Sequence, residues 1–464
     1  MPFNAFAANK TWMASKNSIL LGIGVVCIVI VSWYVQQRLS LMKEYSVEAL
    51  TAAAREDKNL FNNRRIEDAI LNGQNLADGI KYGVTLENMV IRNLTMNNVQ
   101  MWWAHFKNVT FVDCTFIKVD FSDSKFENVK FIRGEIYGYD RRGNATEFDV
   151  GIDRVLFDGV KIGKSVRLNL YGGIVVLRNV TATDEPGGYS MLHGSHLQVR
   201  MDNCTVTNRG VLNLGGDDNS AYITNCRFSN TMPPDTSTRG RWNPGLSLRG
   251  TAAWVENCSV LAGRTPGCKK TVITNCILGD AEIDDGGENS AVFLSKNKYV
   301  MQTGKDVLRL FAPAVDIQET AYLYLYANGV PIPQTVRIGT GNVNIYDTEI
   351  SDLRMQQQNF KTALPHLNLL NVTIKKGDWE YADLRAGKWE HVLLGAPIDL
   401  NKAKIGTITG HYVNFIQGYP WRNGKLEIVD SSKPLEFDKP PVPTLEELGL
   451  AQFWKENDFP VEKY

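Results

Sequence analysis

The sequence predicts a mainly β protein: a parallel β-helix (solenoid) with an N-terminal transmembrane helix and a short C-terminal helix. Three observations lead to this fold class: an uncharged apolar run near the N-terminus, an apolar residue at every fifth position in two stretches, and a six-residue unit that recurs between them. The chain of 464 residues is also too long for one compact core, whereas a repeat array grows along one axis without a size limit.

The apolar run near the N-terminus predicts a membrane anchor. From Ile19 to Val35 the chain has 17 residues without a charge, and Ser18 and flanking aromatic residues extend it to spanning length. No small-residue cleavage site follows, which favours an anchor over a removable signal peptide. Basic residues without acids precede the run. We therefore expect residues 1–17 in the cytoplasm, a single-pass helix at 18–35 in the inner (cytoplasmic) membrane, and the bulk of the chain in the periplasm or outside the cell.

The segment after the anchor has a different composition. It is rich in alanine and in charged residues, as in "YSVEALTAAAREDKNLF", which favours a helix. A solenoid also needs a cap, because its first coil would otherwise expose unpaired strand edges. We therefore expect a helical stalk or cap over residues 36–80.

A five-residue period then governs the chain. Its large apolar positions are Leu86, Ile91, Met96, Met101, Phe106, Phe111, Phe116, Phe121, Phe126, Phe131 and Ile136, and the residue two before each phenylalanine is smaller. Neither a helix nor a plain strand has this period. A chain that turns a corner after every five residues does, and four such sides close a coil of about twenty residues that stacks on the next at about 4.8 Å.

These residues resemble the pentapeptide-repeat family, over residues 84–136 and again over 367–394, where the period passes through Leu369, Ile374, Trp379, Leu384, Trp389 and Leu394. The resemblance implies a right-handed, four-sided β-helix with the large residues on its axis. Many members of that family act through binding and interaction, so the resemblance also implies a role of that kind.

Between the two stretches, a hexamer of the form apolar-x-Asn-Cys/Val-x-x recurs. Its asparagines are Asn179, Asn203, Asn225, Asn257 and Asn275, separated by 24, 22, 32 and 18 residues, about one β-helix coil each. Stacking in register predicts an asparagine ladder at the turns and a column of Cys204, Cys226, Cys258 and Cys276 inside. The architecture resembles the right-handed parallel β-helices of the pectate-lyase-like superfamily, and we expect one solenoid over residues 81–430.

Two other interpretations of the hexamer exist. Three of its asparagines stand in glycosylation sequons, but their regular spacing favours a ladder position over an acceptor. The cysteines could bind a metal, yet the chain has no Cys-x-x-Cys motif. Buried thiols that pack as small apolar side chains are therefore the favoured interpretation.

Function is expected in the loops that depart from the regular coils. Loops that leave neighbouring coils at the same corner would line one surface, and the binding residues we expect there are Tyr137, Tyr139, Arg239, Arg241, Trp242, Asp284 and Asp285. A catalytic alternative uses Asp217 and Asp218 with His193 and Arg239. Paired carboxylates catalyse glycoside hydrolysis, and a carboxylate with an arginine could abstract a proton next to a uronate. Solvated turns are the competing interpretation of the same acidic residues.

No other motif indicates a cofactor. The chain has no nucleotide-binding glycine loop, zinc motif or nucleophile elbow, the acidic run from Asp280 to Glu288 does not fit a calcium loop, and His193 with His196 lacks a third ligand. We expect no cofactor and no metal. The 50 basic and 50 acidic residues also argue against a nucleic-acid partner.

The C-terminal residues 431–464 combine a Pro-rich strip with a short helix that begins at the capping box Thr444 to Glu447. Apolar side chains including Phe453 and Trp454 predict that this segment docks on the solenoid, with a partner as the alternative.

Two functions follow from the sequence. The first is a membrane-anchored envelope protein that serves as a binding or structural scaffold for other membrane or envelope proteins. The alternative is a polysaccharide-acting β-helix enzyme, a hydrolase, lyase or epimerase, anchored at the membrane. The anchor and the lack of a complete catalytic motif favour the first.

Overall fold

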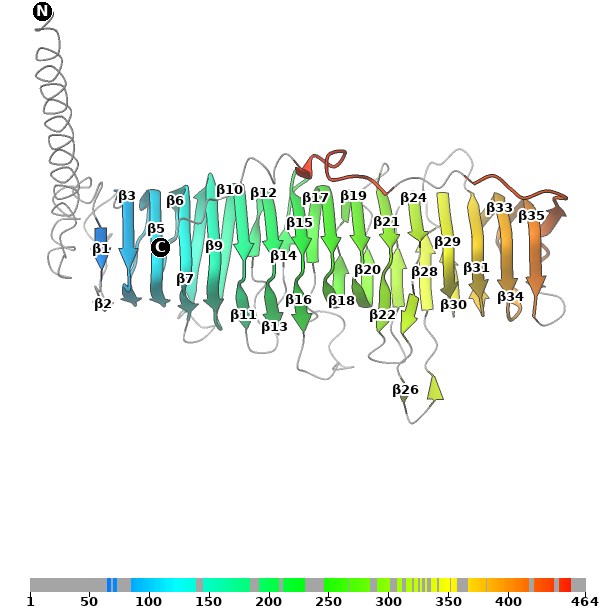
Figure 1. Cartoon of the computed structure of the whole chain (residues 1–464), viewed down its shortest axis with the longest axis horizontal. Helices are drawn as coiled ribbons and strands as arrows, with labels where there is room; N and C mark the ends of the chain where they lie inside the picture. The colour runs from blue at the N-terminus through cyan, green and yellow to red at the C-terminus, as the bar shows by residue number, and fades with distance from the viewer. Residues whose placement is uncertain are drawn as a thin grey trace, which may run out of the picture.

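The structure is a computed structural model. It describes residues 65–67, 70–72, 85–138, 145–183, 192–207, 212–229, 246–265, 267–283, 290–300, 307–310, 314–318, 321–323, 326–327, 330–331, 335–339, 342–350, 352–356, 366–380, 382–416, 421–437 and 442–451. These residues form a mainly β, parallel solenoid of the right-handed type, which confirms the predicted fold class in its main part (Figure 1).

One row of parallel strands, here called face A, runs along the solenoid from the first strand to the last. In order of pairing it contains β1 (Arg65–Glu67), β3 (Thr85–Arg92), β5 (His105–Ile117), β7 (Val129–Tyr137), β9 (Arg154–Ile162), β10 (Val166–Arg178), β12 (Leu192–Asp202), β15 (Ser220–Thr224), β17 (Leu246–Glu256), β19 (Gly267–Thr274), β21 (Ala291–Ser295), β24 (Ala314–Gln318), β29 (Asn342–Ile350), β31 (Leu367–Ile374), β33 (Asp383–Leu394), β35 (Lys404–Phe415) and β37 (Glu427–Asp430). Every pairing in this row is parallel.

Shorter strands complete the other sides of the coils. The side that follows face A holds β2 (Ile70–Asn72), β4 (Thr95–Asn97), β11 (Thr181–Thr183), β13 (Thr205–Thr207), β16 (Arg227–Ser229), β18 (Ser259–Thr265), β20 (Ile277–Ile283), β22 (Lys298–Val300) and β25 (Ala321–Leu323). The remaining sides hold β6 (Ser124–Glu127), β8 (Thr146–Ile152), β14 (Leu212–Leu214), β23 (Val307–Leu310), β28 (Thr335–Gly339), β30 (Asp352–Gln356), β32 (Gly377–Asp378), β34 (Ile398–Asp399) and β36 (Trp421–Arg422). A separate antiparallel pair, β26 (Tyr326–Ala327) and β27 (Val330–Pro331), projects from the solenoid in Figure 1.

Left-handed backbone at every fifth residue produces the corners of the first coils. The residues with positive φ there are Asn88, Asn93, Asn98, Trp103, Asn108, Asp113, Lys118, Asp123, Asn128 and Arg133, with φ between 47° and 58°. Each stands two positions after a large apolar residue of the period. Asparagine and aspartate tolerate this conformation better than other residues with a Cβ, which explains why they are frequent between the apolar positions.

The asparagines of the hexamer occupy the same kind of corner. Asn179, Asn203, Asn225, Asn257 and Asn275 all have φ between 51° and 54°. Asn203 Nδ2 donates to Asn179 Oδ1 at 2.7 Å, and Asn257 Nδ2 donates to Asn225 Oδ1 at 2.6 Å. Asn225 Nδ2 donates to Asp202 Oδ1 instead, at 2.9 Å, so the predicted ladder forms in two parts, one from Asn179 to Asn203 and one from Asn225 to Asn275.

The phenylalanines fill the axis, as the period predicts. All six from Phe106 to Phe131 are buried, and rings in adjacent coils are in contact. Phe111 stacks on Phe131 with centroids 5.1 Å apart, and Phe131 stacks on Phe157 at 4.9 Å. Offset stacking of this kind adds to the free energy gained from burial alone.

The cysteines form an internal column, one position after the corner. Cys204, Cys226, Cys258 and Cys276 are free and buried, and the backbone N–H of each of the first three donates to the sulfur of the next at 3.3–3.4 Å. Cys114, in the corresponding place in its coil, is also buried, and burial raises its pKa to about 12. These thiols are therefore structural, as predicted.

The structure differs from the sequence prediction at the N-terminal cap. The predicted helical segment 36–80 is wrong at residues 65–67 and 70–72, where β1 pairs with Val90–Arg92 of β3 and β2 pairs with β4. Strand pairing satisfies the open edge of the first coil and outweighs local helix propensity. Residues 1–17 and the predicted transmembrane helix at 18–35 lie outside the described residues, and no helix within the described ranges is long and apolar enough to cross a membrane.

The C-terminal segment is described in part. The predicted capping box forms: Thr444 N donates to Glu447 Oε2 at 2.8 Å, and Glu447 N donates to Thr444 Oγ1 at 3.3 Å. Residues 445–449 form turns, and only Leu450 and Ala451 have helical backbone before the described residues end. The elements of the described chain therefore do not include the predicted C-terminal helix.

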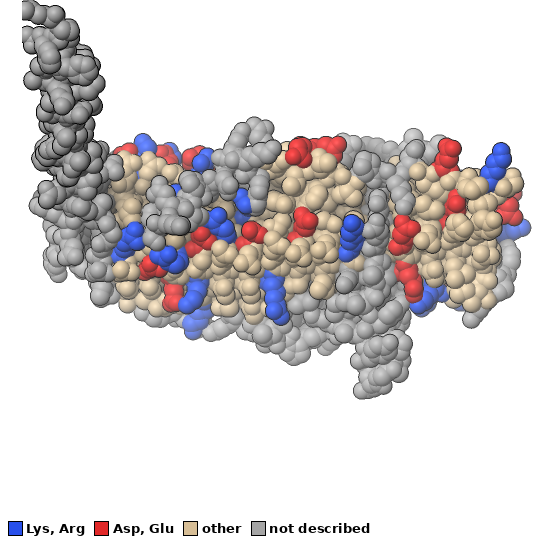
Figure 2. Space-filling model, viewed as in Figure 1, with Lys and Arg blue, Asp and Glu red and all other residues tan. Residues whose placement is uncertain are grey.

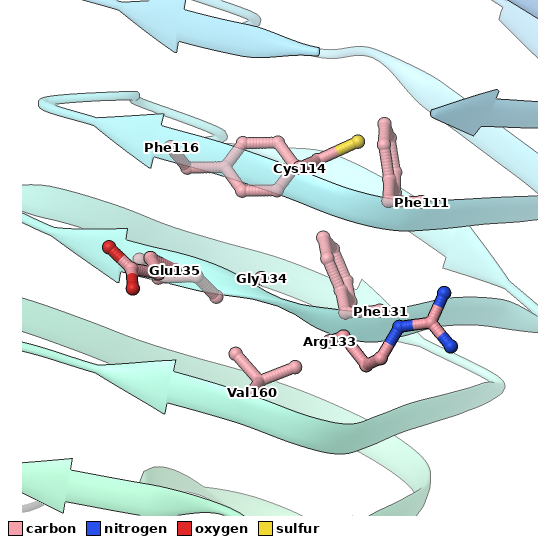
Figure 3. A pocket seen from close by; sticks show the side chains of 9 residues that line it. Phe111, Cys114, Phe116, Phe131, Arg133, Gly134, Glu135 and Val160 are labelled. Atoms are coloured by element: carbon pink, nitrogen blue, oxygen red, sulfur yellow. The ribbon is translucent and has the colours of Figure 1, made fainter. Parts of the chain in front are cut away.

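Gly134 takes a position in the cysteine column where a side chain does not fit. It lies between Cys114 and Val160 in register, beside a small gap in the core lined by Phe111, Phe116 and Phe131 (Figure 3). Its φ is +142°, and an added Cβ would lie 2.4 Å from the carbonyl oxygen of Cys114. The gap does not admit a water molecule, so it is a packing defect and not a ligand site.

We predict that Gly134→Ala lowers the free energy of unfolding by about 1–3 kcal/mol, because the new methyl group collides with rigid backbone and the φ is strained. Denaturant unfolding followed by circular dichroism measures it. Gly151→Ala is the matched control, since its added Cβ meets nothing within 4 Å. Equal stability of the two variants would contradict the prediction.

Candidate functional site

Four polar side chains form a strip on one lateral side of the solenoid. Strands β8, β10, β12 and β14 pair in register so that Asp149, Asn169, His193 and Asn213 stack on one another. Their neighbours in each strand, such as Leu168 and Leu170 in β10, belong to the core. Because side chains alternate across a strand, the four polar residues point outward. We call them the polar strip.

An exposed tyrosine lies beside the polar strip. Tyr171 follows Asn169 by two positions, so it projects from the same side, and 45% of its surface is exposed. Its phenol hydrogen-bonds Asp149, and partial burial together with the nearby Asp149 charge raises its pKa. Asn213 Nδ2 lies 3.2 Å from His193 Nδ1 at the other end of the strip. The surface thus combines amide, carboxylate, imidazole and aromatic groups in adjacent coils.

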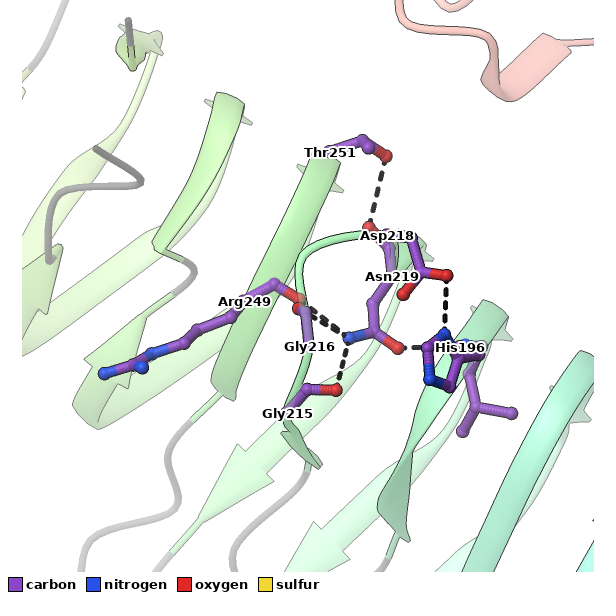
Figure 4. Close-up of polar contacts among 8 residues, drawn as sticks. His196, Gly215, Gly216, Asp218, Asn219, Arg249 and Thr251 are labelled. Atoms are coloured by element: carbon purple, nitrogen blue, oxygen red, sulfur yellow. Dashed lines mark hydrogen bonds and ion pairs between the residues drawn. The ribbon is translucent and has the colours of Figure 1, made fainter. Parts of the chain in front are cut away.

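The turn between β14 and β15 is held by one buried amide, Asn219 (Figure 4). Its Nδ2 lies within hydrogen-bonding distance of three carbonyl oxygens, those of Gly215 at 2.9 Å, Gly216 at 3.0 Å and Arg249 at 2.9 Å. Its Oδ1 accepts from Leu197 N at 2.9 Å. Asn219 therefore connects three consecutive coils and fixes the bend that carries the paired aspartates.

His196 and Asp218 form an exposed pair at this bend. His196 has φ +57°, and its Nδ1 lies 2.7 Å from Asp218 Oδ2. Since a carboxylate only accepts, the imidazole N–H is the donor. The hydrogen bond from His196 lowers the pKa of Asp218. A general acid needs a raised pKa, so Asp218 is suited to stay ionised and to accept hydrogen bonds from a ligand.

The structure places some of the predicted site residues together and separates others. Asp217 and Asp218 are exposed neighbours in the bend, whereas His193 lies on the polar strip beside Asn213, and His196 contacts Asp218 instead. Tyr137 ends β7, half-buried. The other predicted residues lie outside the described residues: Tyr139, Arg239, Arg241, Trp242, Asp284 and Asp285.

Sequence reasoning missed Asp149, Asn169, Tyr171 and Asn219. The signal for the first two is weak but present: Asp149, Asn169, His193 and Asn213 are 20, 24 and 20 residues apart, which is close to one coil. No group of three or more potential metal ligands occurs in the ranges that the structure covers.

We predict that Asn219→Ala lowers the free energy of unfolding by about 2–3 kcal/mol, because it leaves buried backbone groups of three coils without partners. Hydrogen exchange should show lost protection at Leu197, whose N–H group donates to the side-chain oxygen Asn219 Oδ1. Asn213→Ala, at an exposed amide of β14, is the control and should change stability by less than about 0.5 kcal/mol. Unchanged exchange in Asn219→Ala would show that the bend does not depend on this amide.

The chain matches no model of a known protein family and no curated protein.

Proposed function

We propose that the protein is a membrane-anchored envelope component whose solenoid serves as a rigid binding scaffold for other membrane or envelope proteins. The observation that supports this most is face A, one row of parallel strands that continues in register from β1 to β37. Because this row holds all coils in register, the other sides of the solenoid also repeat the same outward position at intervals of about 4.8 Å, and such a side suits an extended binding surface. The anchor at residues 18–35 would hold this rod at the inner membrane, with its bulk in the periplasm or outside the cell.

The charges of the surface are consistent with this role. Basic and acidic side chains lie mixed on the side shown in Figure 2. Several pair between neighbouring coils, as in Arg133 with Asp113, Arg167 with Glu147 and Arg178 with Asp158, each at 2.8–2.9 Å. Because these charges neutralise each other, they create no positive potential that would attract a polyanion. The proposed partners are therefore proteins and not nucleic acids.

The experiment is affinity purification of the detergent-solubilised full-length chain, with co-purifying proteins identified by mass spectrometry. We expect one or more envelope proteins in stoichiometric amounts, and a chain without residues 1–35 should recover less of any partner that is itself in the membrane. Recovery of the full-length chain alone would contradict the scaffold proposal.

A second candidate is polysaccharide binding, and the polar strip with Tyr171 is the observation that favours it. Amide and carboxylate groups match the donors and acceptors of sugar hydroxyls, and an exposed aromatic ring offers a face for the apolar side of a sugar. Asp149, Asn169 and His193 repeat this chemistry along the axis, as a polymer of similar units would require. In the enzyme version of this candidate, Asp217 and Asp218 would act on the bound chain, with His193 and Arg239 as the other predicted catalytic residues.

We predict that Tyr171→Ala weakens binding to an envelope polysaccharide about tenfold, which corresponds to about 1.4 kcal/mol. Glycan-array screening followed by calorimetry on the best ligand measures this. Tyr412→Ala is the matched control, because Tyr412 is also exposed but belongs to β35, far along the solenoid. If the two variants bind equally, the strip is not the binding surface. Degradation of the glycan that is lost in Asp217→Ala and Asp218→Ala would favour the enzyme.

A further inference from the structure

Face A carries apolar side chains on its outer side, and these are buried. Val112, Ile132, Leu156 and Val176 form a cluster separate from the core, and each is at most 4% exposed. Their neighbours along the strands, such as Phe111 and Phe131, fill the axis. Because successive side chains point to opposite sides of a strand, the four residues face away from the core. We call them the outer apolar cluster.

The same pattern continues along face A. Tyr222, Val272 and Tyr346 are buried but are not part of the core, although the residues next to them, such as Ile223, Ile273 and Ile345, are. Polar residues such as Arg200 alternate with these apolar residues in the outward columns. Outward apolar residues that are buried at several levels of face A imply that another segment covers them.

At the C-terminal end of face A, the structure describes a segment that covers the outer side of the strands. Residues 431–437 and 442–451, here called the strap, leave β37 and return along the solenoid. Lys388 Nζ donates to the carbonyl oxygen of Glu436 at 2.8 Å, and Leu435 N donates to Glu390 Oε2 at 2.6 Å. Phe437 then meets the ring of Tyr346 with centroids 6.2 Å apart.

Strand register shows that the strap and the outer apolar cluster lie on the same face. Through successive pairings in face A, the column of Val112 and Ile132 continues through Asp158 and reaches Tyr346 and Glu390. Leu156 and Val176 stand in a second column, two positions earlier in each strand, which continues through Tyr222 and Val272 to Asn344. The strap therefore touches the first of these two columns, which carries part of the cluster further towards the N-terminus.

The strap also runs in the required direction. Its contacts proceed from β33 to β29, and in Figure 1 the described red segment continues toward the N-terminal coils and ends at the level of β15 and β17. Leu450 and Ala451, the last described residues, are buried. The chain has 13 further residues, 452–464, which include Phe453, Trp454, Phe459 and Val461.

We propose that residues 452–464 continue along face A and cover the outer apolar cluster, so that the C-terminus is fastened to the first coils. The length is sufficient: from the level of β17 to β5 is about 30 Å at the coil spacing, and 13 extended residues span up to about 43 Å. The chemistry fits as well, because the four large apolar side chains of the tail match the apolar outer surface of β5, β7, β9 and β10.

The variant Ile132→Cys tests the proposal in the full-length, detergent-solubilised chain. The same chain carries Cys27→Ser, so that Cys27 does not react. The Ile132→Cys thiol should react slowly with a maleimide in the full chain and at least tenfold faster in a chain that ends at Ala451. A synthetic peptide of residues 452–464 should restore the protection. Lys161→Cys, at a highly exposed position of β9, is the control and should react equally in both chains if the truncated solenoid is folded.

Point variants in the full chain separate loss of the contact from loss of folding. Trp454→Ser should accelerate labelling of Ile132→Cys, whereas the neighbouring Lys455→Ser should not. Fast labelling in the full chain would overturn the proposal. So would protection that persists after truncation: a dependence on protein concentration would then identify a second copy as the occupant, and its absence a different segment or a bound partner.

Discussion

The parallel hydrogen-bond ladder between coils is the constraint on which the rest of this structure depends. It places each residue directly above its counterpart in the previous coil, so the two side chains must fit each other in size, charge and hydrogen bonding. In the core, phenylalanine stacks on phenylalanine and cysteine on cysteine. At the corners, asparagine hydrogen-bonds to asparagine. Where charged side chains stack, they have opposite signs and form ion pairs, as Arg133 does with Asp113. Face A, the cysteine column and the polar strip are all consequences of the same register.

The same constraint explains which parts of the fold were predictable. Where the coil length is constant, as from Leu86 to Ile136, stacking appears in the sequence as a fixed period, and the axis residues follow from it. Asn179 to Asn275 were recognisable because left-handed corners select asparagine. The sequence did not reveal β1 and β2, because these short strands lie in a segment whose composition favours a helix. Their extended backbone results from pairing with the edges of β3 and β4.

The candidate site was harder to predict than the fold, because its members come from coils of unequal length. The paired aspartates were visible in the sequence, but the choice between His193 and His196 depends on which residue occupies a left-handed corner, and that is His196. Asn219 resembles any loop asparagine until its four partners in three coils are known. Tyr171 joins Asp149 only through the register of β8 and β10.

A solenoid has a weakness that a globular domain lacks, since each coil contacts only its neighbours and the ends can separate independently. A segment that returns along the outside changes this. The strap joins β33 to β29 through Glu390 and Tyr346, which are separated by more than one coil, so opening either coil also breaks contacts made by the other. Outward apolar side chains such as those of the outer apolar cluster would be an aggregation risk if they were exposed, and a covering strap turns them into a second packed cluster outside the coil. Face A can then carry residues such as Ile132 and Val272 without losing solubility, while the polar strip on another side of the coil stays free for partners.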